Sequence, residues 1–206
     1  MNSRPAKGRR LSPQARRGQL IEAAAKVALE TGGLPVPLDQ LSEAAGASRA
    51  LIYAYFPTQH DLFNAVLARE FEALAAAGLE DASRTPAAPD AAQACALIYF
   101  EHIAAHGPAI HLILRDAFMA AHVDAANRGF RDRIMRRLAR LARREHGLSP
   151  KEAVAMLNLV VTIPEEAGRL AWSGELPPER ARALMTELIA SSVTAFDAPG
   201  GGPRAV

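Results

Sequence analysis

The stretch that decides the fold is residues 38–67, LDQLSEAAGASRALIYAYFPTQHDLFNAVL. Its pattern predicts a short helix over Leu38–Ala45, a turn at Gly46 and a second helix that begins after Ser48. Gly46 can adopt the left-handed backbone conformation that ends a helix, and the Ser48 hydroxyl can accept hydrogen bonds from the free amides of the next helix. The segment is therefore a candidate helix-turn-helix, in which two helices cross steeply.

The second helix has an outer face that suits a DNA groove. Arg49 and Tyr53 are expected to point outward, and the small side chain of Ala50 lets the helix approach a groove floor closely. A glycine turn between short helices also occurs in purely structural α-helical proteins, so a structural role is the alternative for this pattern alone.

The pattern extends to both sides of the turn, over residues 17–67. It consists of Leu20, Ile21, Ala24 and Ala25, then Gly32, Leu41, Ala45-Gly46-Ala47-Ser48, Ile52-Tyr53, Tyr55-Phe56, Asp61-Leu62 and Val66. On these residues the segment resembles the TetR-type transcriptional regulators. The resemblance implies a homodimer with two DNA-reading heads, and a C-terminal helical domain that binds a small molecule or another signal.

Three positions depart from the pattern of that family. The family commonly has a small residue where Leu51 stands and a lysine where Gln59 stands, and both of those residues can contact phosphates. Pro37 precedes the first helix in place of a Ser or Thr cap, and proline is tolerated there because its missing N–H is not needed in the first turn. The head therefore lacks two of the usual phosphate contacts.

The expected DNA contacts divide between base reading and positioning. Arg49 is the candidate for reading guanine through paired hydrogen bonds, while Ser48, Tyr53 and Tyr55 would position the helix on phosphates. Ala50 completes the DNA-facing set in the reading helix.

The basic charge is concentrated before the head. The net charge is only +2, yet the first 17 residues contain no acid and carry the basic residues Arg4, Lys7, Arg9, Arg10, Arg16 and Arg17, so the remaining residues are net negative by four. Such an arm, disordered alone, can follow the phosphate backbone or enter a minor groove, and Arg9, Arg10, Arg16 and Arg17 are its candidate DNA contacts. The alternative is a solubilising tail.

The composition indicates a globular protein. With 206 residues and 50% hydrophobic content, the chain can bury one large core or two small ones. The single cysteine, Cys95, excludes an internal disulfide framework. No signal peptide is recognisable, and the longest apolar stretch, residues 153–163, is too short to span a bilayer. We therefore expect a soluble cytoplasmic protein that does not bind membranes.

The periodicity predicts an all-α protein. Besides the helix-turn-helix, the expected helices cover residues 16–31, 59–77, 91–106, 108–122, 125–146, 150–172 and 178–196, with a linker over residues 81–90. The expected organisation is a basic disordered arm (1–15), a three-helix DNA-binding head (16–60), a helical ligand-binding and dimerisation domain (61–197) and a disordered tail (198–206).

Two apolar helices near the C-terminus are the candidate dimer interface. The helix from Pro150 is apolar on almost every side and must be covered all round, and Pro164 should kink it. The last two helices of each chain build a four-helix interface in the resembled family. The expected interface residues are Leu157, Val160, Val161, Leu184, Leu188 and Ile189, and an ordinary monomer core is the alternative.

The middle helices are expected to hold the ligand. The candidate pocket residues are Phe100, Ile103, His111, Leu114, Phe118, Met135 and Met156, which would line an apolar cavity with a few polar groups. Taken singly, each of these residues is more often part of a core than of a pocket. The group does not name a ligand.

Two further clusters have competing explanations. His102 and His106 share a helix face, but His106 precedes a helix end, where an imidazole is favoured by the helix dipole, so we expect no metal site. The helix over residues 125–146 carries eight arginines around an apolar stripe. They form either a solvated face or, with one or two turned inward, a site for a phosphate or carboxylate.

No phosphate-binding loop, nucleophile elbow, Cys-x-x-Cys or convincing metal motif is present, so we expect neither an enzyme nor a cofactor. The sequence predicts a homodimeric repressor that binds an inverted repeat in double-stranded DNA and is released by a small-molecule effector. The alternatives are a ligand-independent DNA-architectural or protein-docking dimer and, less favoured, an all-α enzyme.

Overall fold

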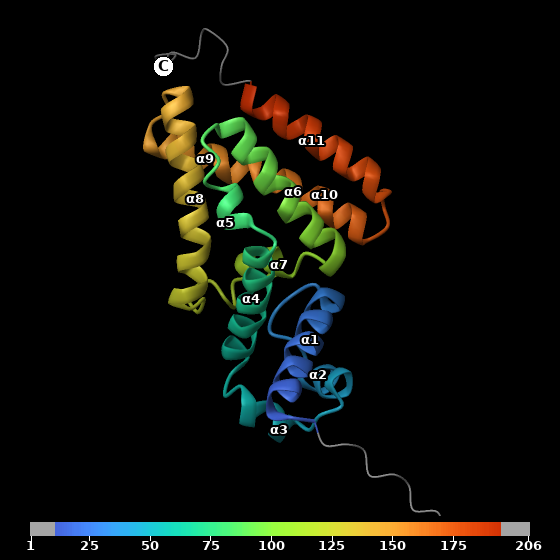
Figure 1. Ribbon diagram of the computed structural model, residues 1–206. Helices are drawn as coiled ribbons and strands as arrows, with labels where there is room; N and C mark the ends of the chain where they lie inside the picture. Colours follow the sequence, from blue (N-terminus) through green and yellow to red (C-terminus); the bar gives the residue numbers. More distant parts are fainter. Residues whose placement is uncertain (1–10, 195–206) are drawn as a thin grey trace, which may run out of the picture.

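The structure is a computed structural model that describes residues 11–194. Its helices are α1 (Pro13–Thr31), α2 (Leu38–Ala45), α3 (Arg49–Tyr55), α4 (Gln59–Ala76), α5 (Leu79–Ala82), α6 (Ala88–His106), α7 (Ala109–Arg115), α8 (Ala125–His146), α9 (Pro150–Val160), α10 (Thr162–Trp172) and α11 (Pro178–Thr194) (Figure 1). These residues contain no strand, which confirms the all-α fold class.

The head consists of α1, α2 and α3 at one end of the molecule, and α4 leads from it into the body (Figure 1). A capping box begins α4: Thr58 Oγ1 accepts a hydrogen bond from the Asp61 N–H, and the Asp61 carboxylate accepts one from the Thr58 N–H. The buried core of the head is continuous with Ile110 and Ile113 of α7, so head and body share one apolar cluster.

The first helix begins three residues earlier than the sequence pattern predicts, at Pro13 instead of residue 16. Ser12 caps it by accepting a hydrogen bond from the Ala15 N–H, and proline is favoured in the first turn. Residues 13–15 of the expected arm are therefore helical. Residues 1–10 lie outside the described part of the chain.

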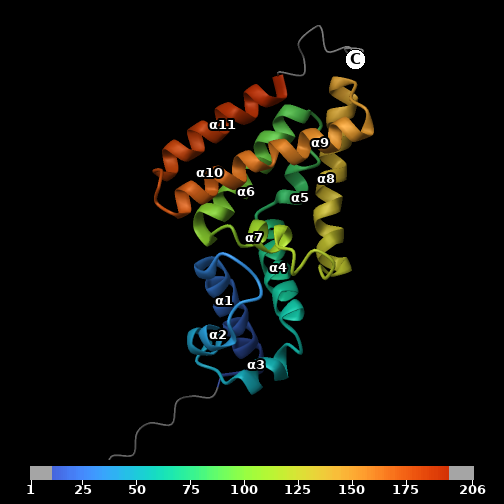
Figure 2. The same cartoon turned by 180° about the vertical axis from the view of Figure 1, so that it is seen from behind.

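The body has α6 at its centre. Figures 1 and 2 place α11 on one side of α6 and α8 on the other. On the first side, Phe100 of α6 is buried with Met185 and Ile189 of α11, while α10 packs on both helices. On the second side, α8 contacts α6 and pairs with α9.

The predicted helix over residues 108–122 is wrong in its second half, because α7 ends at Arg115. Asp116 stops it: its carboxylate accepts hydrogen bonds from the N–H of Phe118 and from the N–H of Leu34 in the head. An aspartate that bonds backbone amides in this way favours a turn over a continued helix.

The α6 helix also begins before the predicted residue 91, and its cap comes from a distant helix. Ala87, at the N-cap position, provides no side-chain hydrogen bond. Both carboxylate oxygens of Glu145 on α8 instead accept from the Ala88 N–H at 2.9 Å. Part of the expected linker is thus helical, as α5 and the start of α6.

The predicted helix over residues 150–172 is two helices, α9 and α10, with Val161 between them. This confirms the disruption expected from Pro164, since proline cannot donate to the carbonyl four residues earlier. The expectation that α9 is covered all round is wrong for the single chain, because Leu159 is 72% exposed. None of the helices within residues 11–194 has both the length and the apolar character that crossing a membrane requires.

Candidate nucleic-acid interface and internal pocket

The turn between α2 and α3 has the predicted geometry. Gly46 adopts a left-handed conformation, with φ of 53°, and the Ala47 N–H donates to the Ser42 carbonyl at 3.0 Å. The Ser48 hydroxyl accepts a hydrogen bond of 3.2 Å from the Leu51 N–H, which caps α3. Ile52 is buried against the head, so the opposite side of α3 faces outward.

That outer face carries most of the residues expected to contact DNA. Ser48, Arg49, Ala50 and Tyr53 are exposed. Tyr55 is half-buried against the core of the head and is the least accessible of the set.

Arg49 is held by an acidic partner on the neighbouring helix. Asp39 Oδ1 accepts hydrogen bonds from Nε of Arg49, at 3.1 Å, and from its Nη2. These bonds raise the pKa of the guanidinium further above its ordinary value. The sequence pattern did not identify this partner, because residues 39 and 49 are brought together only by the crossing of α2 and α3.

The described residues of the basic arm lie at the start of α1. Arg17 places its guanidinium over the ring of Phe56, 5.0 Å from the centroid, and Arg16 donates to Gln19. Arg17 therefore lies beside the end of α3, and Arg16 lies along α1. Arg9 and Arg10 lie outside the described residues.

Gln59, which stands where the family commonly has a phosphate-contacting lysine, has a structural function that the sequence did not indicate. Its amide Nε2 donates to the Val36 carbonyl at 2.9 Å, and its Oε1 accepts from the Val36 N–H at 3.0 Å. A glutamine amide can satisfy both backbone groups at once, whereas a lysine can only donate. Gln59 therefore ties the segment before α2 to the start of α4.

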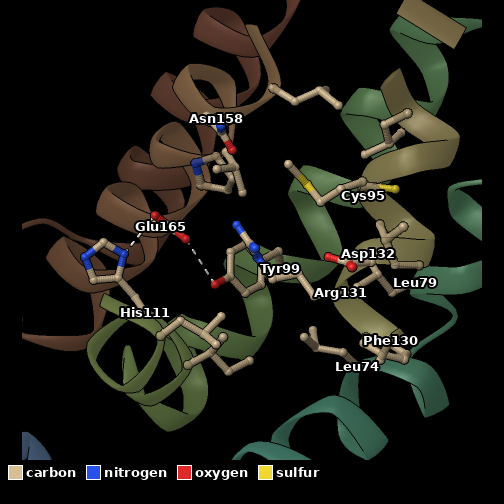
Figure 3. A pocket seen from close by; sticks show the side chains of 18 of the residues that line it. Leu74, Leu79, Cys95, Tyr99, His111, Phe130, Arg131, Asp132, Asn158 and Glu165 are labelled. Carbon is tan, nitrogen blue, oxygen red and sulfur yellow. Dashed lines mark hydrogen bonds and ion pairs between the residues drawn. The ribbon is translucent and has the colours of Figure 1, made fainter. Parts of the chain in front are cut away.

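The body contains a cavity of about 510 Å³ that is lined by residues of α4 to α11. Most of its wall is apolar, and Leu74, Cys95 and Phe130 are among its lining side chains (Figure 3). Burial raises the pKa of the Cys95 thiol to about 12, so this cysteine remains an uncharged part of the wall. The size and lining are those of a small-molecule site.

A polar cluster lies on one wall, around Glu165 of α10. Figure 3 shows His111 and Tyr99 directed at its two oxygens: His111 Nδ1 lies 2.8 Å from Oε2, and the Tyr99 hydroxyl donates to Oε1 at 3.3 Å. Arg115 adds a weaker contact at 3.4 Å. Burial, reinforced by the Glu165 charge, raises the pKa of Tyr99 well above its ordinary value, so its hydroxyl remains a donor.

The cavity contains three of the seven expected ligand residues, His111, Leu114 and Met135. The other four lie elsewhere. Phe100 is in the core between α6 and α11, and Phe118 is stacked on His60. Ile103 packs against Gly168, and Met156 is buried outside the cavity wall. Tyr99 and Glu165 were missed, because single polar residues in helices give no signal until the helices meet.

The expected dimer residues also divide into two groups. Leu157 and Ile189 are buried within the single chain, and Val160 and Val161 are half-buried at the cavity. Leu184 is half-buried and Leu188 is exposed, so α11 retains an apolar surface. The buried members fill the core or the cavity wall, because α9 and α11 each turn one face inward.

The histidines on α6 have protein partners. His102 Nε2 lies 2.8 Å from the buried Glu70 carboxylate, and His106 Nδ1 lies 3.0 Å from the His102 carbonyl. Within residues 11–194, no group of three or more His, Cys, Asp or Glu side chains is arranged to hold a metal ion.

The arginines of α8 fall into two groups. Arg133, Arg136 and Arg144 form surface ion pairs with Glu80, Asp132 and Glu145. Arg128 and Arg131 are also exposed but lie at the cavity, and a site for a phosphate or carboxylate there remains a prediction.

Comparisons with known proteins agree with this arrangement. Residues 20–66 match the model of the family described as bacterial regulatory proteins, tetR family. The HTH-type transcriptional activator FasR of Mycolicibacterium smegmatis is 27% identical over 184 residues, which cover 86% of this chain and 82% of FasR.

Solved structures share the whole fold. A TetR-like transcriptional regulator from Rhodococcus sp. RHA1 has a TM-score of 0.67 at 21% identity, with 90% of this chain and 99% of that chain covered. A TetR variant from Acinetobacter baumannii AYE, solved in complex with minocycline, has a TM-score of 0.59 at 18% identity, with 91% and 97% covered. Through residues 20–66 the chain carries a DNA-binding head of the tetR family, and over 90% of its length it has the fold of a TetR-like transcriptional regulator.

Proposed function

We propose that this regulator is a homodimer whose heads bind an inverted-repeat operator in double-stranded DNA, and that a small-molecule effector in the cavity weakens this binding. The observation that carries the proposal is the course of α7. This helix contributes His111, Leu114 and Arg115 to the cavity wall and ends at Asp116, which bonds Leu34 in the head. An effector that displaces α7 therefore acts on a direct contact with the head.

Such coupling requires different effector affinities in two arrangements of the dimer. Two heads that read one face of a duplex must present their α3 helices about 34 Å apart, one helical turn of DNA. An effector that binds better when the heads are at another separation lowers the affinity for the operator. The factor is the one by which the bound operator lowers the affinity for the effector.

The proposed dimer surface consists of the exposed apolar side chains of α9, α10 and α11. Leu159 is 72%, Leu188 53% and Trp172 43% exposed. Exposed apolar side chains of this size are suited to a symmetrical contact with a second copy. Burying them would also give α9 and α11 the cover that the single chain does not provide.

The dimer is tested by Leu188→Glu, with the mass in solution measured by sedimentation equilibrium. We expect wild type to be a dimer at micromolar concentration and the variant to dissociate. Thr186→Glu is the control, because Thr186 lies on the flank of α11 that carries Arg182 and its ion pair with Glu101. A wild-type monomer would reject the symmetrical operator as well.

Selection of bound duplexes from a random pool tests DNA recognition. We expect an inverted repeat, and we expect Arg49→Ala to weaken binding to it by roughly 5- to 100-fold with a relaxed base preference. Deleting residues 1–10 should lower affinity for all duplexes and reduce the salt dependence. This truncation leaves the Ser12 cap of α1 intact.

The effector is tested on the recovered operator. A compound that raises the melting temperature of the protein should release the duplex, while Leu114→Trp, which fills the cavity, should bind DNA without responding. A protein that binds DNA but is released by no cavity-binding compound would be the ligand-independent architectural or docking dimer.

The proposed outcome of DNA binding is repression that the effector relieves. FasR is named an activator, so a reporter driven by the operator-containing promoter is needed to separate the two outcomes. Loss of the protein raises reporter transcription if it represses and lowers it if it activates.

A second proposal concerns an acidic group on the effector. Arg115, Arg128 and Arg131 line the cavity, and within residues 11–194 neither Arg128 nor Arg131 forms an ion pair with a carboxylate. A carboxylate or phosphate attached to an apolar body would meet both the arginines and the apolar wall. Pairs of apolar compounds that differ only in a carboxylate or an uncharged amide test this, and Arg131→Gln should remove the preference for the acid.

A further inference from the structure

The ion pair between Asp39 and Arg49 joins the two helices of the helix-turn-helix on their exposed side. Arg49 begins α3, and Asp39 is the second residue of α2. Their side chains are 58% and 80% exposed. One carboxylate oxygen, Oδ1, accepts from both Nε and Nη2 of the guanidinium, and no hydrogen bond to the other oxygen, Oδ2, is formed by residues 11–194.

This contact occupies one edge of the guanidinium and leaves another edge open. Arginine has five N–H donors in a rigid plane. With Nε and one hydrogen of Nη2 directed at Asp39, both hydrogens of Nη1 and the outer hydrogen of Nη2 remain. Guanine presents O6 and N7 side by side in the major groove, and an arginine can donate to both at once. The open edge therefore has the donors that paired recognition of guanine requires.

The pair does not have the properties of a stabilising contact. Ion pairs between exposed side chains contribute little to folding. With the head on DNA, Asp39 would add a negative charge near the phosphates, and Arg49 is the only Lys or Arg in residues 38–67. Pairing the Arg49 guanidinium with an acidic side chain lowers the attraction of the head to DNA of any sequence. The arrangement is useful where discrimination matters more than total affinity.

We propose that Asp39 is a specificity-determining residue of the head: it positions Arg49 for guanine and, through its charge, weakens binding to DNA that lacks guanine at that position. The proposal rests on the proposed role of Arg49 in base reading. Asp39 is a positioning residue, since it acts through the guanidinium.

The test compares the full chain with Asp39→Asn in selection from a random duplex pool, followed by titration of the recovered operator and of its guanine-substituted versions. We expect the preference for guanine at one position of each half-site to fall roughly tenfold. Binding to unrelated duplex should increase several-fold, because a charge that repels phosphates is removed. Glu43→Gln is the matched control: it removes an exposed acid from the same helix that forms no ion pair with Arg49, and it should leave the preference unchanged.

A second comparison, in the Arg49→Ala background, separates positioning from a general effect on α2. There Asp39→Asn should leave base preference unchanged, since the guanidinium that it positions is absent. Two results overturn the proposal: an undiminished guanine preference in Asp39→Asn, or an equal change with and without Arg49. If selection with the wild-type protein yields no sequence motif, the proposed sequence-specific DNA binding is refuted, and the proposed role of Asp39 is refuted with it.

Discussion

Asp116 Oδ2 accepts a hydrogen bond of 2.9 Å from the backbone N–H of Leu34, a residue 82 positions earlier in the chain. The other oxygen, Oδ1, accepts from the Phe118 N–H at 2.8 Å. One carboxylate therefore shapes the turn after α7 and binds the loop after α1. It is a direct polar link between the cavity-bearing body and the head.

We expect Asp116→Ala to lower the free energy of unfolding by about 1–3 kcal/mol, because it removes a charged acceptor from two backbone amides. The same change should weaken the response of DNA binding to an effector, since the link between α7 and the head is lost. Urea unfolding and operator titration measure the two effects. Glu22→Ala, on the exposed surface of α1, is the control; a similar loss in both variants would contradict the assigned role.

Gly168 allows α10 to pack closely on α6. A Cβ at this position would lie 2.7 Å from Ile103 Cβ and 2.8 Å from its Cγ2. Gly168→Ala should therefore destabilise the fold by about 1–3 kcal/mol through overpacking. Gly18→Ala is the matched control, because a Cβ there meets no atom within 4 Å and α1 gains helix propensity of up to about 1 kcal/mol. Thermal unfolding that shows equal stability for the two variants would refute close packing at Gly168.

The buried Glu70 carboxylate is expected to make stability depend on pH. Burial raises its pKa, but the close contacts of its carboxylate with His102 and Arg69 outweigh burial and hold the pKa below its ordinary value of 4.5. The charged form therefore stabilises the fold above pH 4.5, and this contribution is lost as the pH falls through the lower folded-state value.

Glu70→Gln tests this dependence. Near neutral pH the variant should be less stable than wild type by about 1–3 kcal/mol, because the buried His102 and the partly exposed Arg69 lose their charged partner. The difference should shrink under acid conditions, where Glu70 of wild type is protonated. Urea unfolding over this range measures it, and a difference independent of pH would show that the charge of Glu70 has no part in stability.

Gln59→Lys exchanges a structural contact for a charge that the family commonly has. The Val36 N–H loses its acceptor, so the fold should lose about 1–3 kcal/mol. Affinity for any duplex should rise several-fold with a steeper salt dependence, because one more phosphate can be neutralised. Gln59→Met separates the effects: it should lose the same stability without gaining affinity. If Gln59→Lys gains no affinity, residue 59 does not reach the phosphates.

The local features of the head could be predicted from the sequence. Gly46 and Ser48 act on backbone groups within a few residues, so their effect could be inferred without knowing the rest of the fold. The start of α6 could not be predicted in the same way, since its capping carboxylate is supplied by Glu145, 57 positions away.

The candidate site shows the same division. Arg49 and Tyr53 could be assigned to the outer face of α3 from helical spacing, but the pairing of Arg49 with Asp39 depends on how α2 and α3 cross. In the body, helical periodicity identified apolar faces without showing which ones meet. The cavity consequently contains His111 and Leu114 but not Phe100, which α11 covers instead.

The sequence by itself determined that this chain is all helical, that it carries a helix-turn-helix and that it resembles one family of regulators, because turns, caps and periodicity act over short distances. Only the tertiary structure decided which polar groups face one another. Tyr99 and Glu165, Asp116 and Leu34, and Asp39 and Arg49 become partners through helix packing, and packing depends on the shapes of distant surfaces that no local pattern records.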